Sequence, residues 1–135
     1  MILILGGTTE GRLAVKVADE AGSPYYYSTR GIQQEIACRN GIHLTGGMDV
    51  EAMTSFCIHH QIRLLVDAAH PFAVGLHQTV HETAIRLNLP VVRVERSYPE
   101  RATDIVWRED YEDAVCKLEK DRIHSLLSLT GVQTI

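Results

Sequence analysis

MILILGGTTEGR, at residues 1–12, is the part of the sequence that says most about the fold. Met1–Leu5 is an uninterrupted apolar run, which is typical of a strand buried on both faces of a sheet. The run stops at Gly6-Gly7, and the hydroxyls of Thr8 and Thr9 can cap a helix that begins there. A strand, a glycine turn and a capped helix together indicate the start of a parallel sheet.

The same alternation of strand and helix continues along the chain. Apolar runs predict strands at 25–28, 42–45, 63–67 and 91–94, and periodic patterns predict helices at 13–21, 49–60 and 72–88. Residues 105–108 and 125–129 also resemble strands, 111–120 a helix, and 32–39 a short helix or turn. Strands separated by helices favour right-handed crossovers. We therefore predict an α/β fold, a Rossmann-like doubly wound parallel sheet with helices on both faces.

Composition excludes several classes of protein. The chain has 135 residues, of which 45% are hydrophobic and 22% charged, as in an ordinary globular domain. A net charge of −4 does not fit non-specific nucleic-acid binding. Cys38, Cys57 and Cys116 are scattered without a CxxC pair, which favours unpaired thiols in a cytoplasmic protein over a disulfide framework or zinc site. No apolar run is long enough to span a membrane. From the net charge and from this observation, respectively, we expect neither a nucleic-acid nor a membrane partner.

The first loop of the predicted sheet has the character of a phosphate-binding turn. In doubly wound sheets, ligands bind beyond the carboxyl ends of the strands. Gly6 and Gly7 would let the backbone approach a phosphate, while Thr8, Thr9 and the helix N-terminus supply donors. Thr8 stands where G-x-G-x-x-G has its second glycine, so the motif departs from the standard fingerprint. The alternative is a tight turn with a well-capped helix and no ligand.

The loop after the second strand bears on which cofactor is bound. An NAD site usually has an acidic residue here to hold the ribose 2′-hydroxyl. This chain has Ser28, Thr29 and Arg30 instead. A guanidinium and two hydroxyls suit a 2′-phosphate, which favours NADPH as the cofactor. The alternative is an arginine that contacts only solvent.

A third loop, DAAHP at 67–71, follows the clearest internal strand. Asp67 could cap the next helix, and His70 could face the ligand cleft. An imidazole titrates in the neutral range, which suits proton delivery, although water could equally supply the proton. The alternative is that His70 only hydrogen-bonds nearby backbone.

Three segments resemble the precorrin-6A reductases of cobalamin biosynthesis and their counterparts that act on cobalt-precorrin-6A. These are GGTTEGR at 6–12, DAAHPFA at 67–73 and VRVER at 92–96, and the resemblance extends in order over the whole chain. LTGV at 129–132 resembles the start of the family's second domain. The segment at 67–73 is the most specific, although Ala69 stands where the family usually has Thr, and His77 and Thr79 where it often has Ser and Asn.

The resemblance implies an NADPH-dependent oxidoreductase that transfers hydride to a conjugated double bond of precorrin-6A or cobalt-precorrin-6A. It implies that the phosphates or ribose of the cofactor contact the first loop, at Gly6, Gly7, Thr8 and Thr9 and also at Glu10. Ser28 to Arg30 would lie near the adenosine, and Asp67 and Ala68 near the nicotinamide, with His70 as the catalytic candidate.

The resemblance also implies that the chain is incomplete. Residues 1–125 would form the NADP-binding domain, and 126–135 would begin a C-terminal domain that is otherwise missing. Because a bound macrocycle needs both walls of the cleft, this half alone would be weakly active or inactive. Arg93 and Arg96 could bind the carboxylates of the macrocycle. Interleaved Glu95 and Glu100 leave open that these arginines only pair with neighbouring acids.

Two alternatives come from other functional classes. His77 and His81, four residues apart beside Glu82, could share a metal, although the chain has no HExxH and the spacing fixes no third ligand, so the prediction is no metal site. A non-catalytic nucleotide-binding or regulatory module would keep the first two loops without a use for Asp67 and His70. A short-chain dehydrogenase is excluded because no tyrosine has a lysine four residues later.

Overall fold

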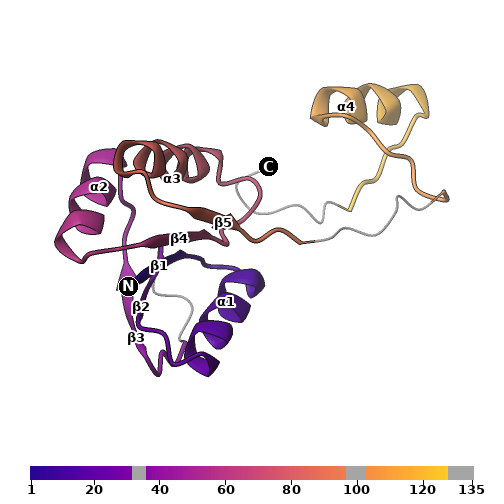
Figure 1. Cartoon of the computed structure of the whole chain (residues 1–135). Coiled ribbons are helices and arrows are strands. Elements are labelled where there is room, and N and C mark those ends of the chain that lie inside the picture. Colours follow the sequence, from indigo (N-terminus) through magenta and orange to yellow (C-terminus); the bar gives the residue numbers. More distant parts are fainter. Residues whose placement is uncertain (32–35, 97–102, 128–135) are drawn as a thin grey trace. The chain divides into compact units, whose positions relative to one another are not determined.

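Five parallel strands form a single sheet in the order β3-β2-β1-β4-β5 in the computed structural model, which describes residues 1–31, 36–96 and 103–127. The strands are β1 (Ile2–Leu5), β2 (Tyr25–Thr29), β3 (Gly41–Thr45), β4 (Leu64–Asp67) and β5 (Val91–Arg93). The helices of the same unit are α1 (Thr9–Glu20), α2 (Val50–His59) and α3 (Val74–Leu87) (Figure 1).

The centre of the sheet is β1. Ile2 of β1 is in register with Tyr25 of β2 on one side and with Leu64 of β4 on the other. The strand order reverses between β1 and β4, which is the switch point where ligands bind in this fold class. The loop after β1, which the sequence predicts to bind phosphate, therefore lies next to the loop after β4 at the carboxyl edge.

Helices cover both faces of the sheet because successive strand side chains point to opposite faces. Leu3 and Leu5 of β1 pack with residues of α2 and α3, including Met53 and Val80. Ile4 packs instead with residues of α1, among them Val15 and Ala18. Figure 1 shows α1 on one side of the sheet and α2 with α3 on the other. The predicted doubly wound α/β fold is confirmed.

The structure divides into two compact units, Met1–Ser97 and Tyr98–Ile135, and all the elements above belong to the first. The described part of the second unit, 103–127, contains α4 (Tyr111–Lys120), whose N-terminus is capped by the Asp110 side chain. The domain boundary predicted after residue 125 stays a prediction. Within the described residues, no helix is both long and apolar enough to cross a membrane.

The predicted strand at 105–108 is wrong. These residues form turns and irregular backbone, and Ile105, Val106 and Trp107 are 54%, 65% and 48% exposed. A strand needs a neighbour for its backbone hydrogen bonds, and no described strand lies beside this segment. Residues 125–127 are likewise irregular, whereas 128–129 lie outside the described residues. Of the predicted helix or turn at 32–39, residues 32–35 are also outside, and 36–38 have no regular structure.

Candidate functional site

The loop between β1 and α1 is shaped by two glycines and one threonine. Gly7 has φ +104°, a conformation that side chains disfavour, and its N–H donates to the Tyr27 hydroxyl at 3.0 Å. Thr8 caps α1: its hydroxyl accepts from the Gly11 N–H at 3.1 Å and donates to the Ala68 carbonyl at 2.7 Å. A Cβ added at Gly6 would lie 2.3 Å from the Tyr27 ring, so the loop rests directly on that ring.

The first turn of α1 presents backbone N–H groups at this edge. Thr9 and Glu10 belong to that turn, and the backbone N–H groups of a helix's first turn have no carbonyl within the helix to bond to. The hydroxyl of Thr8 is already committed to Gly11 and Ala68. The backbone and dipole of α1, rather than the Thr8 side chain, are therefore what this loop offers an anion.

The loop after β2 places one arginine at the carboxyl edge. Ser28 and Thr29 are buried, 6% and 4% exposed, whereas Arg30 is exposed. The Thr29 hydroxyl donates to the Gly31 carbonyl at 2.9 Å and lies 2.8 Å from Nε2 of His43, which then acts as donor. Thr29 thus holds the loop, and Arg30 is the cationic side chain presented there.

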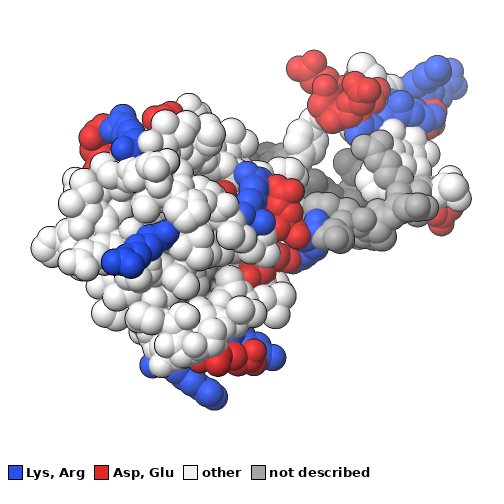
Figure 2. Space-filling model, in the orientation of Figure 1, with Lys and Arg blue, Asp and Glu red and all other residues white. Residues whose placement is uncertain are grey.

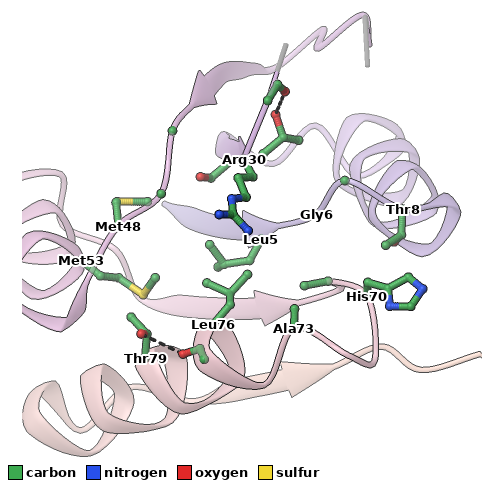
Figure 3. Close-up of a pocket in the computed structure, with 18 of the residues that line it drawn as sticks. Leu5, Gly6, Thr8, Arg30, Met48, Met53, His70, Ala73, Leu76 and Thr79 are labelled. Carbon is green, nitrogen blue, oxygen red and sulfur yellow. Dashed lines mark hydrogen bonds between the residues drawn. The ribbon is translucent and has the colours of Figure 1, made fainter. Parts of the chain in front are cut away.

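A cavity of about 750 Å³ joins these loops at the switch point. That volume lies within the range of small-molecule and cofactor sites. Its walls come from the loops after β1, β2, β3 and β4 and from the start of α3, as Figure 3 shows. Arg30 is the only lysine, arginine or acidic residue among the described lining residues. The cavity therefore offers one cationic side chain, Arg30, to an anionic group of a ligand, and its described lining has no acidic side chain to repel one.

The structure brings together only some of the predicted site residues. Those that line the cavity are Gly6, Gly7, Thr8, Ser28, Thr29, Arg30 and His70. The other predicted residues are not among the described lining residues, namely Thr9, Glu10, Asp67, Ala68, Arg93 and Arg96. Thr9 and Glu10 directly follow Thr8 as the first residues of α1, and buried Ala68 contributes its carbonyl to Thr8.

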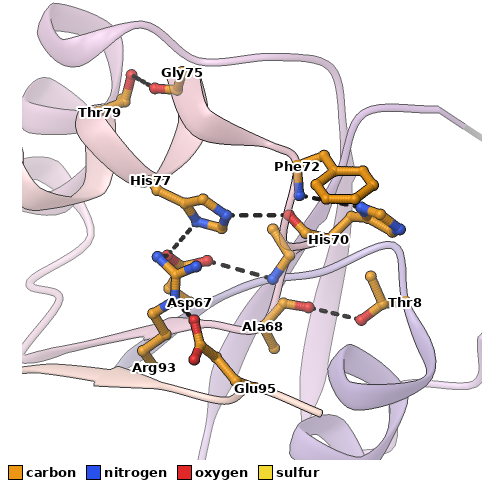
Figure 4. Close-up of polar contacts among 11 residues, drawn as sticks. Thr8, Asp67, Ala68, His70, Phe72, Gly75, His77, Thr79, Arg93 and Glu95 are labelled. Carbon is orange, nitrogen blue, oxygen red and sulfur yellow. Dashed lines mark hydrogen bonds and ion pairs between the residues drawn. The ribbon is translucent and has the colours of Figure 1, made fainter. Parts of the chain in front are cut away.

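Asp67 is a buried carboxylate at the end of β4 with a full set of partners. Its side chain is 4% exposed, accepts from the Ala69 N–H at 3.3 Å and lies 2.7 Å from Nδ1 of His77 (Figure 4). The Arg93 guanidinium is 3.8 Å from the same oxygen that faces His77. A buried carboxylate is costly unless it is paired in this way. Asp67 thus organises the β4–α3 loop.

His70 lies in that loop beside the cavity. Its Nδ1 accepts from the Phe72 N–H at 3.2 Å, so the neutral ring carries its hydrogen on Nε2. The ring centroid is 5.1 Å from that of Phe72. In this arrangement the side chain is a hydrogen-bond donor. Proton delivery requires a second proton on Nδ1 and breaks the bond to Phe72.

The arginines near the end of β5 are paired with acids. Arg93 makes an ion pair with Glu95, and Arg96 Nε lies 2.8 Å from the Glu10 carboxylate. The hydrogen bond from Arg96 lowers the pKa of Glu10. In Figure 2 several blue side chains of the first unit adjoin red ones, which agrees with these pairs.

Several site residues were missed by sequence reasoning. The loop after β3 contributes Gly46, Gly47 and Met48 to the cavity, and α2 contributes Met53. The Gly-Gly pair at a strand end was a usable signal, because all parallel strands end at the same edge. His77 was considered as a metal ligand and as a departure from the family pattern, but not as the partner of Asp67. Among the described residues no group of three His, Cys, Asp or Glu could hold a metal.

Comparisons with known proteins identify the family to which the sequence is similar. The family model "Precorrin-6x reductase CbiJ/CobK" matches residues 1–135. A precorrin-6A reductase from Rhodococcus erythropolis is 34% identical over 97 residues, which are 70% of this chain and 39% of the relative. A cobalt-precorrin-6A reductase from Priestia megaterium is 27% identical over 141 residues, covering 100% of this chain and 54% of the relative.

Among solved structures, a CobK precorrin-6A reductase superposes with a TM-score of 0.73 at 22% identity, covering 85% of this chain and 47% of that one. At this identity the likeness concerns the fold alone. The chain spans about half or less of the length of the curated relatives named here. Because the family model covers the whole sequence, the chain belongs to the precorrin-6x reductase CbiJ/CobK family.

Proposed function

We propose that this chain forms the NADPH-binding half of a reductase acting on precorrin-6A or cobalt-precorrin-6A in cobalamin biosynthesis. NADPH would supply a hydride, which is one proton with two electrons, to one carbon of a conjugated double bond. A proton adds to another carbon of that conjugated system, and NADP⁺ leaves. The family membership supports the reductase and its substrate class. The second half and the cytoplasmic location belong to the same proposal.

The observation that supports NADPH as the cofactor is the charge of the cavity lining. A glycine turn followed by a capped helix lies on one side of the cavity, and Arg30 is the only Lys, Arg, Asp or Glu among the described lining residues. We infer that the α1 N-terminus receives the pyrophosphate and that Arg30 receives the 2′-phosphate. Glu10 and Asp67, whose carboxylates are held by Arg96 and His77, would then act on the cofactor only through the loops they organise.

His70 remains the proposed catalytic residue. It lines the cavity in the loop after β4, where the nicotinamide would lie if the pyrophosphate occupies the loop after β1. Its Nε2–H can donate a hydrogen bond to the macrocycle or to a water that delivers the proton. Arg93 and Arg96 are proposed substrate contacts, and a carboxylate of the macrocycle would have to displace Glu95 or Glu10 to reach them.

The cofactor proposal is tested by calorimetric titration of the chain with NADPH and with NADH. A charge-assisted bond to the 2′-phosphate is worth about 1.5–3 kcal/mol, so NADPH is expected to bind roughly ten- to a hundredfold more tightly. Arg30→Ala should abolish the difference. Arg63→Ala, a matched loss of an exposed arginine preceding β4, should not. Equal affinities in the wild-type chain, or no binding of either, would refute the proposal.

Reductase activity is tested by oxidation of NADPH in the presence of the macrocycle, with the second half supplied in the same chain or as a separate polypeptide. A macrocycle-dependent loss of NADPH that His70→Ala slows supports the reaction. Binding of NADPH without any such loss would favour the non-catalytic nucleotide-binding module instead.

A further inference from the structure

We propose that His77 is a positioning residue that fixes how His70 faces the cavity. The His77 ring connects the Asp67 carboxylate at the end of β4 to the His70 carbonyl in the following loop (Figure 4). This proposal rests on the proposed function in one respect: the proposed function supplies the ligand that His70 would contact.

The geometry of the His77 ring uses both of its nitrogens. Nδ1 lies 2.7 Å from Oδ2 of Asp67, and Nε2 lies 3.1 Å from the carbonyl oxygen of His70. Both partners are acceptors without hydrogens, so the ring makes both bonds only when both nitrogens carry hydrogen. The His77 side chain is 12% exposed; its bond to Asp67 is partly buried, whereas its bond to the His70 carbonyl is exposed.

The charges around the ring are balanced within the described residues. Asp67 faces it directly, and Arg93 approaches the same carboxylate oxygen at 3.8 Å. Glu95 in turn pairs with Arg93 and offsets its charge. His70 presents its backbone carbonyl rather than its ring. The His77 ring thus lies between one buried carboxylate and one backbone carbonyl.

The His70 carbonyl helps to hold the turn that orients the His70 side chain. It accepts a second hydrogen bond, from the Ala73 N–H at 2.8 Å, which closes the turn that leads into α3. In the same turn the Phe72 N–H donates to Nδ1 of His70 and selects the tautomer with hydrogen on Nε2. If the bond from His77 is lost, the His70 carbonyl is held by the Ala73 N–H alone, and the turn that places the Phe72 N–H is less firmly fixed.

Two conservative variants separate the two bonds of His77. The amide nitrogen of Asn lies near the position of Nδ1, so His77→Asn can still donate to Asp67 but cannot reach the His70 carbonyl. The longer Gln places its amide near the position of Nε2, so His77→Gln can reach that carbonyl while losing the direct bond to Asp67. A merely structural histidine would respond to both changes in the same way.

The experiment records ¹⁵N shifts of the His70 ring in the 135-residue chain at neutral pH, without cofactor, beside thermal unfolding of each variant. The wild-type chain and His77→Gln should show a single His70 tautomer with hydrogen on Nε2. His77→Asn should show a mixture of the two neutral tautomers. Its affinity for NADPH should fall about fivefold, as expected for one lost hydrogen bond of about 1 kcal/mol.

A wild-type His70 spectrum in His77→Asn would overturn the proposal, and so would an equal change in both variants. If neither variant folds, the wild-type chain decides: N–H signals at both His77 nitrogens support the connection, and a bare nitrogen overturns it. Should the His70 spectra respond as expected while no chain binds NADPH, the cofactor proposal fails and the positioning role stands.

Discussion

Replacing Gly6 with alanine should destabilise the first unit because the loop after β1 rests on the Tyr27 ring. A Cβ at position 6 would lie 2.3 Å from Cε2, 2.6 Å from the hydroxyl oxygen and 2.7 Å from Cζ of Tyr27. Ordinary contacts between such atoms are about 3.5–4.0 Å. The ring is 0% exposed, so it can move only by disturbing the core around it.

The expected cost is that of overpacking, about 1–3 kcal/mol in the free energy of unfolding. For a unit of this size, such a loss lowers the melting temperature by roughly 4–8 °C per kcal/mol. Gly75→Ala is the matched control, because its added Cβ meets nothing within 4 Å and the position is helical. That change should stabilise the protein by about 0.5–1 kcal/mol.

Urea unfolding followed by circular dichroism measures both variants. The double variant Gly6→Ala with Tyr27→Leu tests the contact directly. Once the Tyr27 ring is removed, Gly6→Ala should cost less free energy of unfolding than it does in the wild-type protein. An unfolding midpoint for Gly6→Ala equal to that of wild type would refute the close approach. So would a double variant whose loss equals the sum of the two single losses.

Two further predictions concern titratable groups. Because the hydrogen bond from Arg96 lowers the pKa of Glu10, this carboxylate contributes stability above its unfolded pKa that is lost as pH falls through the folded value. Glu10→Gln should therefore flatten the decline of the melting temperature below about pH 5, and an unchanged decline would contradict the ion pair. Burial raises the pKa of the Cys57 thiol to about 11, so Ellman's reagent should label exposed Cys116 first and Cys57 only on unfolding. Prompt labelling of Cys57 in the folded chain would show that it is not buried.

Much of the sheet was predictable because its signals are local. Apolar runs that end in glycine gave β1 and the end of β3, and Thr8 caps α1 as its position suggested. The expected strand at 105–108 failed for a non-local reason: an apolar run becomes a strand only where a neighbouring strand accepts its hydrogen bonds.

The candidate site was predictable as a place but not as a set of contacts. Parallel strands bring their carboxyl ends to one edge, so Gly6, Arg30 and His70 could be grouped from sequence alone. The pairing of Glu10 with Arg96 joins residues 86 positions apart, and no local pattern encodes it. The contact between Asp67 and His77 depends on the path of an irregular loop. These pairings redirect residues that sequence reasoning had assigned to ligands.

The hydrogen bond from the Thr8 hydroxyl to the Ala68 carbonyl joins the two loops on either side of the switch point. A ligand that orders one of these loops therefore lowers the entropic cost of ordering the other. Any coupling that this bond transmits is reciprocal: if a ligand at the β4 side strengthens binding at the β1 side, a ligand at the β1 side strengthens binding at the β4 side by the same factor. Two ligand portions held at the two loops would in this way bind cooperatively through a single shared hydroxyl.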